Sequence, residues 1–556
     1  MGRRSRNRKM AKITKIEPRD TSESGLKYYY WGILLLLILF VAFIRIRLIS
    51  IPLERDEGEF AYIGQLILQG IPPYLNSYDQ KLPGIYGAYA IIMYVFGQSA
   101  EGIHLGFLIV NAATIILVFL LGKRLYDSYT GIIASAAFAV LSVSPSVLGT
   151  SAHATHFVLL PALGGIILML RATDSGKLRN LFWSGILLGI SFIIKQHAVF
   201  VVIFAFLYLL FHLRRVRDLP FRPLLKHSSL FLFGTVIPFA FAVGILSLAG
   251  VFEKFWFWTF LYPFEYGSQI PLSLALEVFL NHTVDVVDKF YLLWGIGGLG
   301  LTALWWDRTA RTRTPFAVGF LAFSLMAVCP GFYFRPHYFV LILPAVAVLI
   351  GIGISSLKRL FSRIQPKFHF IPTILFLLAF FYGMIQYGSF FFKLTPVQAC
   401  RAMYGPNPFP ESIPIAEYIK THSKGQDKIV VLGSEPQIYF YSKRQSATGY
   451  FYVYHLMEDQ GYALKMQKEM AEEIERAKPK YLVFVNIYTS WLANVRSERY
   501  VLEWLRVYLK KEFSLVGVVD ILSSDRTEYR WDSEAANYAP RSPYFLCVYK
   551  NNTAGG

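Results

Sequence analysis

The sequence predicts a polytopic α-helical membrane protein with a soluble α/β domain at its C-terminal end, on the outer side of the membrane. Of its 556 residues, 54% are hydrophobic and 16% are charged, whereas soluble proteins have about 45–50% apolar and about 25% charged residues. About eleven apolar runs approach the roughly 20 residues that a membrane span requires. After residue 392 the composition becomes that of a soluble protein. We therefore divide the chain into a basic N-terminus (1–27), a membrane part (28–392) and a soluble domain (393–556).

The positive charge of the chain indicates membrane topology rather than nucleic-acid binding. The formal net charge is +19, but the Lys and Arg residues lie mostly in short loops between apolar runs. The three cysteines, Cys329, Cys400 and Cys547, are far apart in sequence and form no metal-binding pair. The composition thus predicts membrane lipid as the surroundings of the chain, with no nucleic-acid partner.

The apolar runs are predicted to form transmembrane helices. Residues 3–19 contain eight Lys and Arg side chains, and the apolar run 28–44 follows without a small-residue cleavage site. We therefore expect an uncleaved first helix with its N-terminus in the cytosol. The other ten runs are 103–122, 129–149, 154–170, 180–194, 197–212, 228–250, 288–306, 315–330, 337–356 and 369–388.

The loops between these runs alternate in charge along the chain. The connections around 149–156, 195–197, 251–287 and 331–337 are poor in Lys and Arg, and the intervening loops are rich in them. The positive-inside rule places the basic loops in the cytosol and the others outside. The apolar stretch 83–97 would break this alternation if it crossed the membrane, so we predict a helix at the outer interface. A twelve-span arrangement is the alternative.

The soluble domain shows alternating strand and helix patterns. An odd number of spans from a cytosolic N-terminus places this domain outside the cytosol. The expected strands are 428–433, 481–486, 515–522 and 544–550, and the expected helices lie near 414–422, 463–478 and 497–512.

The first outer loop, residues 45–102, contains a dense acidic cluster beside a membrane span. Asp56, Glu57 and Glu59 begin a short helix whose apolar face includes Ile63 and Leu66. Such a helix would lie on the membrane and hold the carboxylates at the depth of the lipid headgroups. The alternative is that these carboxylates only cap the helix and are otherwise solvated.

Basic residues at the outer ends of later spans complete a candidate site. Lys81 follows the acidic helix, Lys195 interrupts an apolar run, and Arg335 precedes His337 and Tyr338 at the start of a later span. A charged residue in or near the hydrocarbon costs about 2.5–3.5 kcal/mol, so such residues usually have a functional partner. Lys195 could instead extend its ammonium group to the interface.

Carboxylates and cations at one membrane face suit the transfer of a group from a lipid phosphate. A carboxylate can activate an acceptor hydroxyl as a general base, while fixed cations stabilise a phosphate leaving group. A lipid-linked sugar phosphate would provide that leaving group. The outer compartment lacks nucleotide sugars, so an enzyme working there has reason to use a donor carried on a lipid.

The segment Arg55 to Tyr62, with Gly70, Tyr74 and the run Lys81 to Tyr86, resembles the first outer loop of the GT-C glycosyltransferases. The similarity is to the bacterial branch of protein O-mannosyltransferases and lipid A aminoarabinose transferases, over roughly residues 28–390. The resemblance implies a dolichyl-phosphate-mannose-protein mannosyltransferase-like domain. Members of this family generally invert the configuration at the anomeric carbon of the sugar by direct displacement.

The same resemblance assigns roles to individual residues. Asp56 takes the position of the catalytic aspartate, with Glu57 beside it, and Lys81 matches the lysine that binds the polyprenyl phosphate. Lys195 and Arg335, with the neighbouring His337 and Tyr338, match less sharply and would complete the phosphate site.

Two histidines suggest a metal site. His153 and His156 are three residues apart, a spacing that would place both rings on one face of a helix, where they could join Asp56 or Glu57 around a divalent ion. Packing or hydrogen bonding is the alternative role of these histidines.

The sequence as a whole predicts a glycosyltransferase in the cytoplasmic membrane of a bacterium. It would move a hexose or pentose from a polyprenyl phosphate donor to a glycolipid, polysaccharide or protein acceptor at the outer face. The alternative is a transporter or flippase of lipid-linked sugars, but such proteins usually carry ionisable residues near the membrane midplane and have repeated halves.

Overall fold

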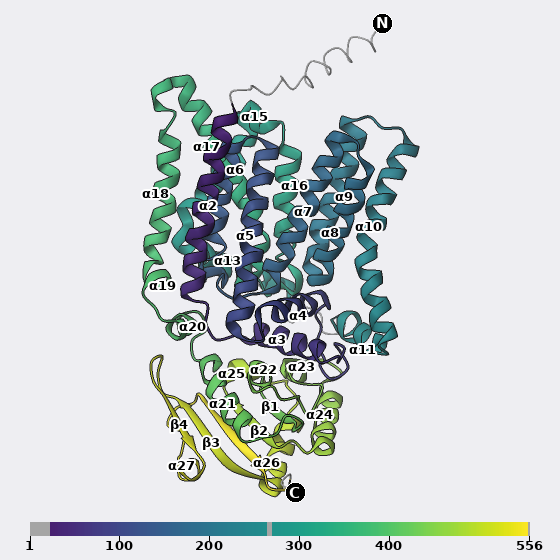
Figure 1. Ribbon diagram of the computed structural model, residues 1–556, viewed down its shortest axis with the longest axis vertical. Coiled ribbons are helices and arrows are strands. Elements are labelled where there is room, and N and C mark those ends of the chain that lie inside the picture. Colours follow the sequence, from purple (N-terminus) through teal and green to yellow (C-terminus); the bar gives the residue numbers. More distant parts are fainter. Residues whose placement is uncertain (1–22, 264–269, 554–556) are drawn as a thin grey trace.

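The computed structural model describes residues 23–263 and 270–553. A bundle of long, roughly parallel helices stands on a C-terminal domain that contains a β-sheet (Figure 1). The predicted basic segment lies outside the described residues, apart from the few that begin the first helix.

Each of the eleven predicted spans coincides with a helix of the bundle. Seven helical stretches are long and apolar enough to cross a membrane, and three of the other four predicted spans are shorter apolar helices of 10–17 residues. The chain is therefore a multi-pass membrane protein, while the count of eleven spans stays a prediction. The helices are α2 (Glu23–Arg47), α5 (Ala100–Leu125), α6 (Ser128–Leu141), α7 (Ala154–Ser175), α8 (Leu178–Ile194), α9 (Val199–Phe211), α10 (Phe221–Leu248), α14 (Tyr291–Trp306), α16 (Thr314–Met326), α17 (Leu343–Ile364) and α18 (Ile371–Gln386).

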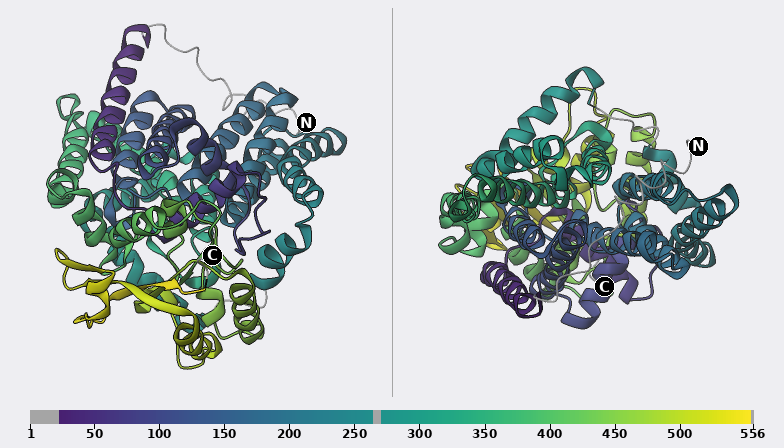
Figure 2. Two further views of the ribbon diagram at one scale, coloured as in Figure 1. Left: turned by 60° about the horizontal axis from the view of Figure 1, so that its bottom comes forward. Right: turned by 90° about the horizontal axis from the view of Figure 1, so that it is seen from above.

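The two ends of the bundle differ. The N-terminal end of α2 and the short helix α15 (Arg308–Arg311) lie at the end far from the C-terminal domain (Figure 1). The helices α11 (Phe252–Trp256), α19 (Gly388–Phe392) and α20 (Pro396–Tyr404) lie at the near end. The bundle seen from above has α2, in purple, at its rim (Figure 2). The basic 308–313 loop and the C-terminal domain thus lie at opposite ends, as the charge pattern predicts.

The acidic helix of the first outer loop is α3 (Arg55–Leu68), and 11 of its 14 residues are buried. Protein therefore covers both faces of this helix, whereas the sequence predicted that its apolar face would lie on the membrane. A side chain at Gly64 would lie 2.7 Å from Met93 of α4 (Gly84–Phe96), and one at Gly58 would lie 2.6 Å from the amide nitrogen of Gln437. These two glycines let α3 approach α4 on one face and α22 (Gln437–Ser442) of the C-terminal domain on the other.

Helix α4 is the predicted interfacial helix. It lies beside α3 at the domain end of the bundle rather than along the spanning helices (Figure 1). Ile91, Tyr94 and Val95 are exposed on its outer face, as expected for contact with lipid or headgroups.

The C-terminal domain contains a five-stranded sheet of order β1-β2-β5-β3-β4, in which β1 and β2 are parallel and the other neighbours antiparallel. Four of the strands were predicted; β4, which lies at the sheet edge (Figure 1), was not, because its residues are mostly polar and partly exposed. The strands are β1 (Ile429–Leu432), β2 (Tyr481–Asn486), β3 (Phe513–Ile521), β4 (Thr527–Trp531) and β5 (Phe545–Asn551). The main helices are α21 (Phe409–Thr421), α22, α23 (Tyr454–Met457), α24 (Ala463–Ala477), α25 (Tyr488–Trp491) and α26 (Tyr500–Glu512).

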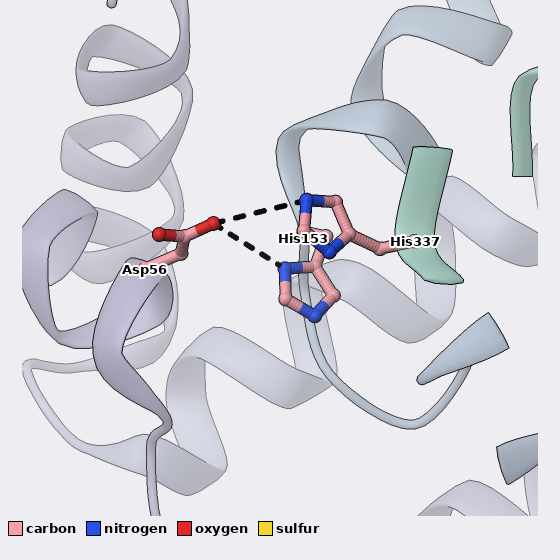
Figure 3. Close-up of side chains that lie close together, drawn as sticks. All are labelled: Asp56, His153 and His337. Carbon is pink, nitrogen blue, oxygen red and sulfur yellow. Dashed lines mark ion pairs between the residues drawn. The ribbon is translucent and has the colours of Figure 1, made fainter. Parts of the chain in front are cut away.

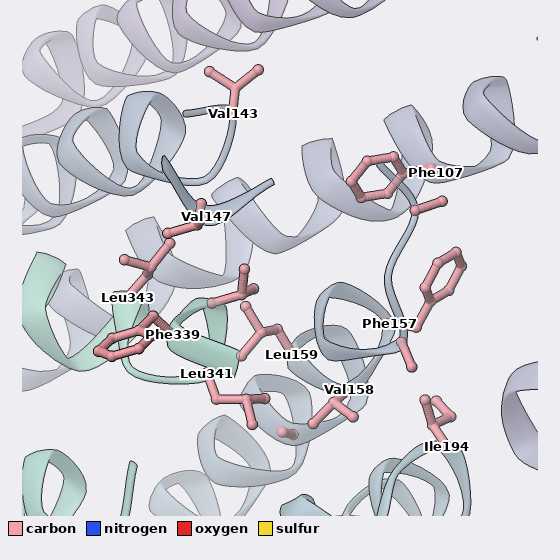
Figure 4. Close-up of a cluster of buried hydrophobic side chains, with 14 of the residues drawn as sticks. Phe107, Val143, Val147, Phe157, Val158, Leu159, Ile194, Phe339, Leu341 and Leu343 are labelled. Atoms are coloured by element: carbon pink, nitrogen blue, oxygen red, sulfur yellow. The ribbon is translucent and has the colours of Figure 1, made fainter. Parts of the chain in front are cut away.

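A cluster of buried apolar side chains holds the start of α7 beside the short helix that precedes α17. Phe157 and Leu159 of α7 lie in one buried cluster with Phe339 and Leu341 of the short helix η7 (Pro336–Leu341) (Figure 4). This packing holds the start of α7 against η7. His153, which precedes α7, is therefore held beside His337, which lies in η7.

Candidate functional site

The site lies at the N-terminal end of α3, where the bundle meets the C-terminal domain. Asp56 is at its centre, with 22% of its side chain exposed. One carboxylate oxygen lies 3.9 Å from Nζ of Lys81, and the other lies 3.9 Å from Nδ1 of His153 and 3.9 Å from Nε2 of His337 (Figure 3). The structure therefore brings together predicted residues that are up to 281 positions apart in the sequence, from 56 to 337.

Lys81 is held by three carboxylates. Its ammonium group lies 2.6 Å from Glu59, 3.7 Å from Asp79 and 3.9 Å from Asp56. The rings of Phe60 and Tyr452 lie 5.3 and 5.5 Å from the same nitrogen. Burial opposes the charge of Lys81, but the carboxylates outweigh it and raise the pKa, so Lys81 is a permanent cation of the site.

The two buried carboxyl groups beside Lys81 have opposite pKa shifts. Burial and the neighbouring charge of Asp79 raise the pKa of Glu59 well above its ordinary value. Burial also acts on Asp79, but Lys81 and hydrogen bonds from Glu59 and Tyr86 lower its pKa. The surroundings thus favour the protonated form of Glu59 more than that of Asp79, since two carboxylates this close resist ionising together.

Asp56 is ionised at neutral pH. Burial raises the pKa of Asp56, but interactions with Lys81 first, and then with His153, Lys195 and Arg335, lower it below the ordinary value. A carboxylate in such surroundings stays ionised and can accept a hydrogen bond from an acceptor hydroxyl.

Lys195 and Tyr338 lie together near this centre. Nζ of Lys195 is 4.7 Å from the ring centroid of Tyr338, and Arg335 lies beside them as an exposed residue before η7. Burial lowers the pKa of Lys195 to about 8, with Asp56 opposing and Lys81 and Arg335 adding to the shift. Three cations thus converge on Asp56 from the ends of different elements.

Glu57 has a different position from the one predicted. It is fully buried, and its carboxylate accepts hydrogen bonds from the backbone N–H of Ala152 (2.6 Å) and of Glu54 (3.2 Å) and contacts Nε2 of His104 (3.0 Å). These contacts fix the chain just before His153. The geometry therefore favours Glu57 as a positioning residue rather than a group that touches substrate.

The predicted pairing of His153 with His156 is wrong. The ring of His156 packs against Phe107, with centroids 4.8 Å apart, and does not face Asp56. The reason is local: His153 is the N-cap of α7 and has an extended backbone, so the three-residue spacing does not place both rings on one helical face. His337 takes the place that was predicted for His156.

Asp56, His153 and His337 fit a divalent metal ion. Their ligand atoms all lie within 4.8 Å of one another. The two imidazole rings are stacked with centroids 4.2 Å apart, so they would have to turn before both could hold one ion in their planes. Among the described residues, neither nitrogen of His153 makes a hydrogen bond, and nor does Nδ1 of His337, although all three are buried. Two imidazoles and a carboxylate are a common ligand set for zinc, whose ligands in a tetrahedral site lie about 3.4 Å apart.

The C-terminal domain contributes one wall of the site, which the sequence did not predict. Arg55 donates hydrogen bonds to the carbonyl of Ser434 (2.5 Å) and to Glu435 (2.7 Å). Nε2 of His455 lies 4.0 Å from Asp79, and Tyr452 faces Lys81. The run of aromatic residues 450–455 in an otherwise soluble domain was the available signal, but no spacing rule connects it with the first outer loop.

Comparisons with known proteins agree with this architecture. Residues 82–243 match the sequence profile of the family described as dolichyl-phosphate-mannose-protein mannosyltransferase. No curated protein sequence matches. The crystal structure of ArnT from Cupriavidus metallidurans bound to undecaprenyl phosphate is similar with a TM-score of 0.58 and 14% identity, covering 96% of this chain and 99% of that one.

Two further solved structures share the fold. The Archaeoglobus fulgidus oligosaccharyltransferase in its apo form has a TM-score of 0.54 and 12% identity, over 94% of this chain and 76% of that one. Arabinofuranosyltransferase AftD from Mycobacteria has a TM-score of 0.52 and 12% identity, over 94% of this chain and 40% of that one. The chain therefore has the GT-C fold of these membrane glycosyltransferases.

Proposed function

We propose that the chain is a membrane glycosyltransferase that moves one sugar from a polyprenyl phosphate donor to an acceptor hydroxyl. The observation that supports this most directly is the position of Asp56, an ionised carboxylate within 4 Å of Lys81, His153 and His337. A base surrounded by fixed cations suits a reaction in which a hydroxyl loses a proton while a phosphate departs.

The proposed step is a direct displacement at the anomeric carbon of the sugar. The acceptor oxygen forms a bond to this carbon, the bond from the carbon to the phosphate oxygen breaks, and Asp56 takes the hydroxyl proton. The polyprenyl phosphate leaves with the electron pair, and its added charge is stabilised by Lys81, Lys195 and Arg335. Attack from the side opposite the phosphate inverts the configuration.

The position of the cations supports a lipid-borne phosphate. Lys195 follows the apolar helix α8, and Arg335 precedes the short helix η7, which leads into α17; from there a polyprenyl chain could remain in the bilayer while its phosphate reaches the site. The similar ArnT structure is bound to undecaprenyl phosphate. This supports a polyprenyl phosphate donor, with a hexose or pentose as the sugar.

A divalent ion held by Asp56, His153 and His337 would polarise the acceptor hydroxyl as a Lewis acid. Asp56 also lies near Lys81, so the protein alone already offers a cation beside the carboxylate. We place the reaction at the outer face of a bacterial cytoplasmic membrane, with a glycolipid, polysaccharide or protein as the acceptor.

The test is transfer of radiolabelled sugar from total membrane lipid into product, measured in membranes with the intact protein and with Asp56→Asn or Lys81→Met. Asp459→Asn and Lys420→Met are matched controls, because both side chains are exposed on the C-terminal domain. Label should enter product with the intact protein and with both controls.

Equal labelling by Asp56→Asn would remove the catalytic assignment. Movement of lipid-linked sugar between leaflets, without any product, would instead favour the flippase.

A further inference from the structure

A cavity of about 280 Å³ lies beside the candidate site, between the membrane part and the C-terminal domain. One side is formed by α11 and the following turn, which include Lys254 and Phe257, and the other side by the start of α24, with Lys465 and Glu469. Tyr78 of the first outer loop also lines it. The cavity therefore exists only where three segments far apart in sequence meet.

Aromatic rings make up much of the cavity wall. Trp258 stacks on Tyr78 with centroids 5.6 Å apart and an angle of 13°, and Tyr450 meets the same tyrosine edge-on at 4.9 Å. These three residues are buried and form the floor. Phe257 and Tyr462 are half-buried, 5.4 Å apart and nearly perpendicular, and they border the opening. Flat aromatic faces of this kind pack well against the C–H face of a sugar ring.

The charges at the cavity favour a neutral ligand. Its lining includes two acidic residues, Glu253 and Glu469, and two basic residues, Lys254 and Lys465, so their formal charges cancel. Lys254 already donates to the hydroxyl of Tyr78 at 2.9 Å. Carboxylates and ammonium groups together can accept from and donate to several hydroxyls. A phosphate or a carboxylate ligand would gain little from this balance.

Two residues of the cavity wall, Tyr78 and Trp258, neighbour the residues that hold Lys81. Tyr78 precedes Asp79 in the chain, and the ring of Trp258 lies 5.5 Å from that of His455, whose Nε2 is 4.0 Å from Asp79. The cations assigned to the lipid phosphate, Lys195 and Arg335, come from the turn after α8 and the turn before η7. The cavity thus lies close to the same centre, separated from Lys81 by the side chains of His455 and Asp79.

We propose that this cavity binds one neutral sugar residue of the acceptor, which makes the acceptor a glycan rather than a bare protein side chain. The proposal rests on the proposed glycosyl transfer and names the acceptor class for it. The volume is slightly below the usual range of about 300–1,000 Å³ for small-molecule sites, which suits a single ring. The neighbouring sugars of the glycan would remain in solvent.

The experiment is saturation-transfer difference NMR on the full chain in lipid nanodiscs. The probes are the neutral disaccharides mannobiose, cellobiose and N,N′-diacetylchitobiose, with mannose 6-phosphate as the charged comparison. The variants are Tyr462→Ala and Phe257→Ala, and Tyr462→Phe keeps the ring while it removes the hydroxyl. The matched control is Tyr488→Ala, because Tyr488 is 67% exposed on the C-terminal domain and does not line the cavity.

At least one neutral disaccharide should bind to the intact protein, to Tyr488→Ala and to Tyr462→Phe, and should bind about tenfold more weakly to both alanine variants. Failure of every neutral disaccharide to bind, equal binding to all variants, or a preference for mannose 6-phosphate would overturn the proposal. Asp56→Asn separates the two proposals, since it should lose sugar transfer and keep disaccharide binding. Disaccharide binding without any donor-dependent transfer would remove the glycosyltransferase function and keep the cavity as a sugar site.

Discussion

The ion pair between Arg55 and Glu435 joins the membrane part to the C-terminal domain and gives a quantitative prediction. Glu435 is fully buried and Arg55 is 8% exposed, and the guanidinium also donates to the carbonyl of Ser434 and to Asn407 (3.2 Å). In the variant Arg55→Met, Glu435 would keep only its short hydrogen bond from Ser490. A buried carboxylate would then lack a counter-charge at the boundary between the two parts.

Removing one partner of a buried ion pair costs about 3–5 kcal/mol. At about 1.4 kcal/mol for each factor of ten, the population in which this boundary is open should rise by at least about a hundredfold. The double variant Arg55→Met/Glu435→Leu removes both charges and should regain most of that loss. The bonds of Arg55 to Ser434 and Asn407 would not be regained.

Amide hydrogen exchange of residues 432–437, followed by mass spectrometry, measures the open population. Arg496→Met is the matched control, because Arg496 pairs with Asp459 at 3.2 Å on the surface and is 77% exposed. An exposed pair contributes about 0–1 kcal/mol, so exchange should change less than about fivefold. Exchange in Arg55→Met that stays within threefold of the intact protein, or a double variant that opens more than Arg55→Met, would refute the reasoning.

Four further predictions concern the site and its support. Asp56→Asn should lower sugar transfer about 10²–10⁴-fold without weakening donor binding, as measured by single-turnover transfer and by lipid binding. His153→Ala should lose bound Zn²⁺ or Mn²⁺, measured by elemental analysis of protein dialysed against each ion; equal metal content in the variant would contradict the ligand assignment. Burial lowers the pKa of Lys195 to about 8, so its positive charge is present below pH 8 and is lost above it. Donor affinity should therefore fall as the pH rises through about 8, and the variant Lys195→Arg should not show this fall. Gly58→Ala places a methyl group 2.6 Å from the amide nitrogen of Gln437 and should destabilise the boundary by about 1–3 kcal/mol, measured by exchange in the same segment.

The predictions for Gly58 and Lys195 each have a control variant. Gly461→Ala is matched to the glycine variant, because a methyl group at that position on the C-terminal domain meets no atom within 4 Å. Lys195→Met should bind donor weakly at every pH. A pH dependence that persists in Lys195→Arg would assign the titration to another group.

The positions of the helices and of most strands could be predicted because each is a local apolar pattern. All eleven predicted runs are helices, and four of five strands were found from alternating or continuous apolar residues. Strand β4 has no such pattern, and its place at the sheet edge comes from pairing with β3. Burial of both faces of α3 could not be predicted either, because Gly58 and Gly64 allow close contact without indicating what makes it.

The sequence indicated the site residues whose charge is unusual beside an apolar run. It did not indicate the residues whose contacts in the site depend on the folded chain. Asp56, Lys81 and Lys195 were found because charged residues beside apolar runs are unusual. Glu59 and Asp79 were present in the same loop, but their contact with Lys81 depends on the turn between α3 and α4. The role of His337 as the partner of His153 depends on the packing of η7 against α7, which no short-range pattern encodes.

Because α3 is buried between the helix bundle and the C-terminal domain, it limits which domain exchanges and truncations the protein can tolerate. A chimaera that carries the C-terminal domain of another protein with this fold would replace Gln437 opposite Gly58, and the aromatic segment that faces Lys81. A truncation after α19 would open the same helix to water. The bundle and the domain are therefore expected to diverge as one unit in evolution, with exchange of the domain tolerated only when α3 is exchanged with it.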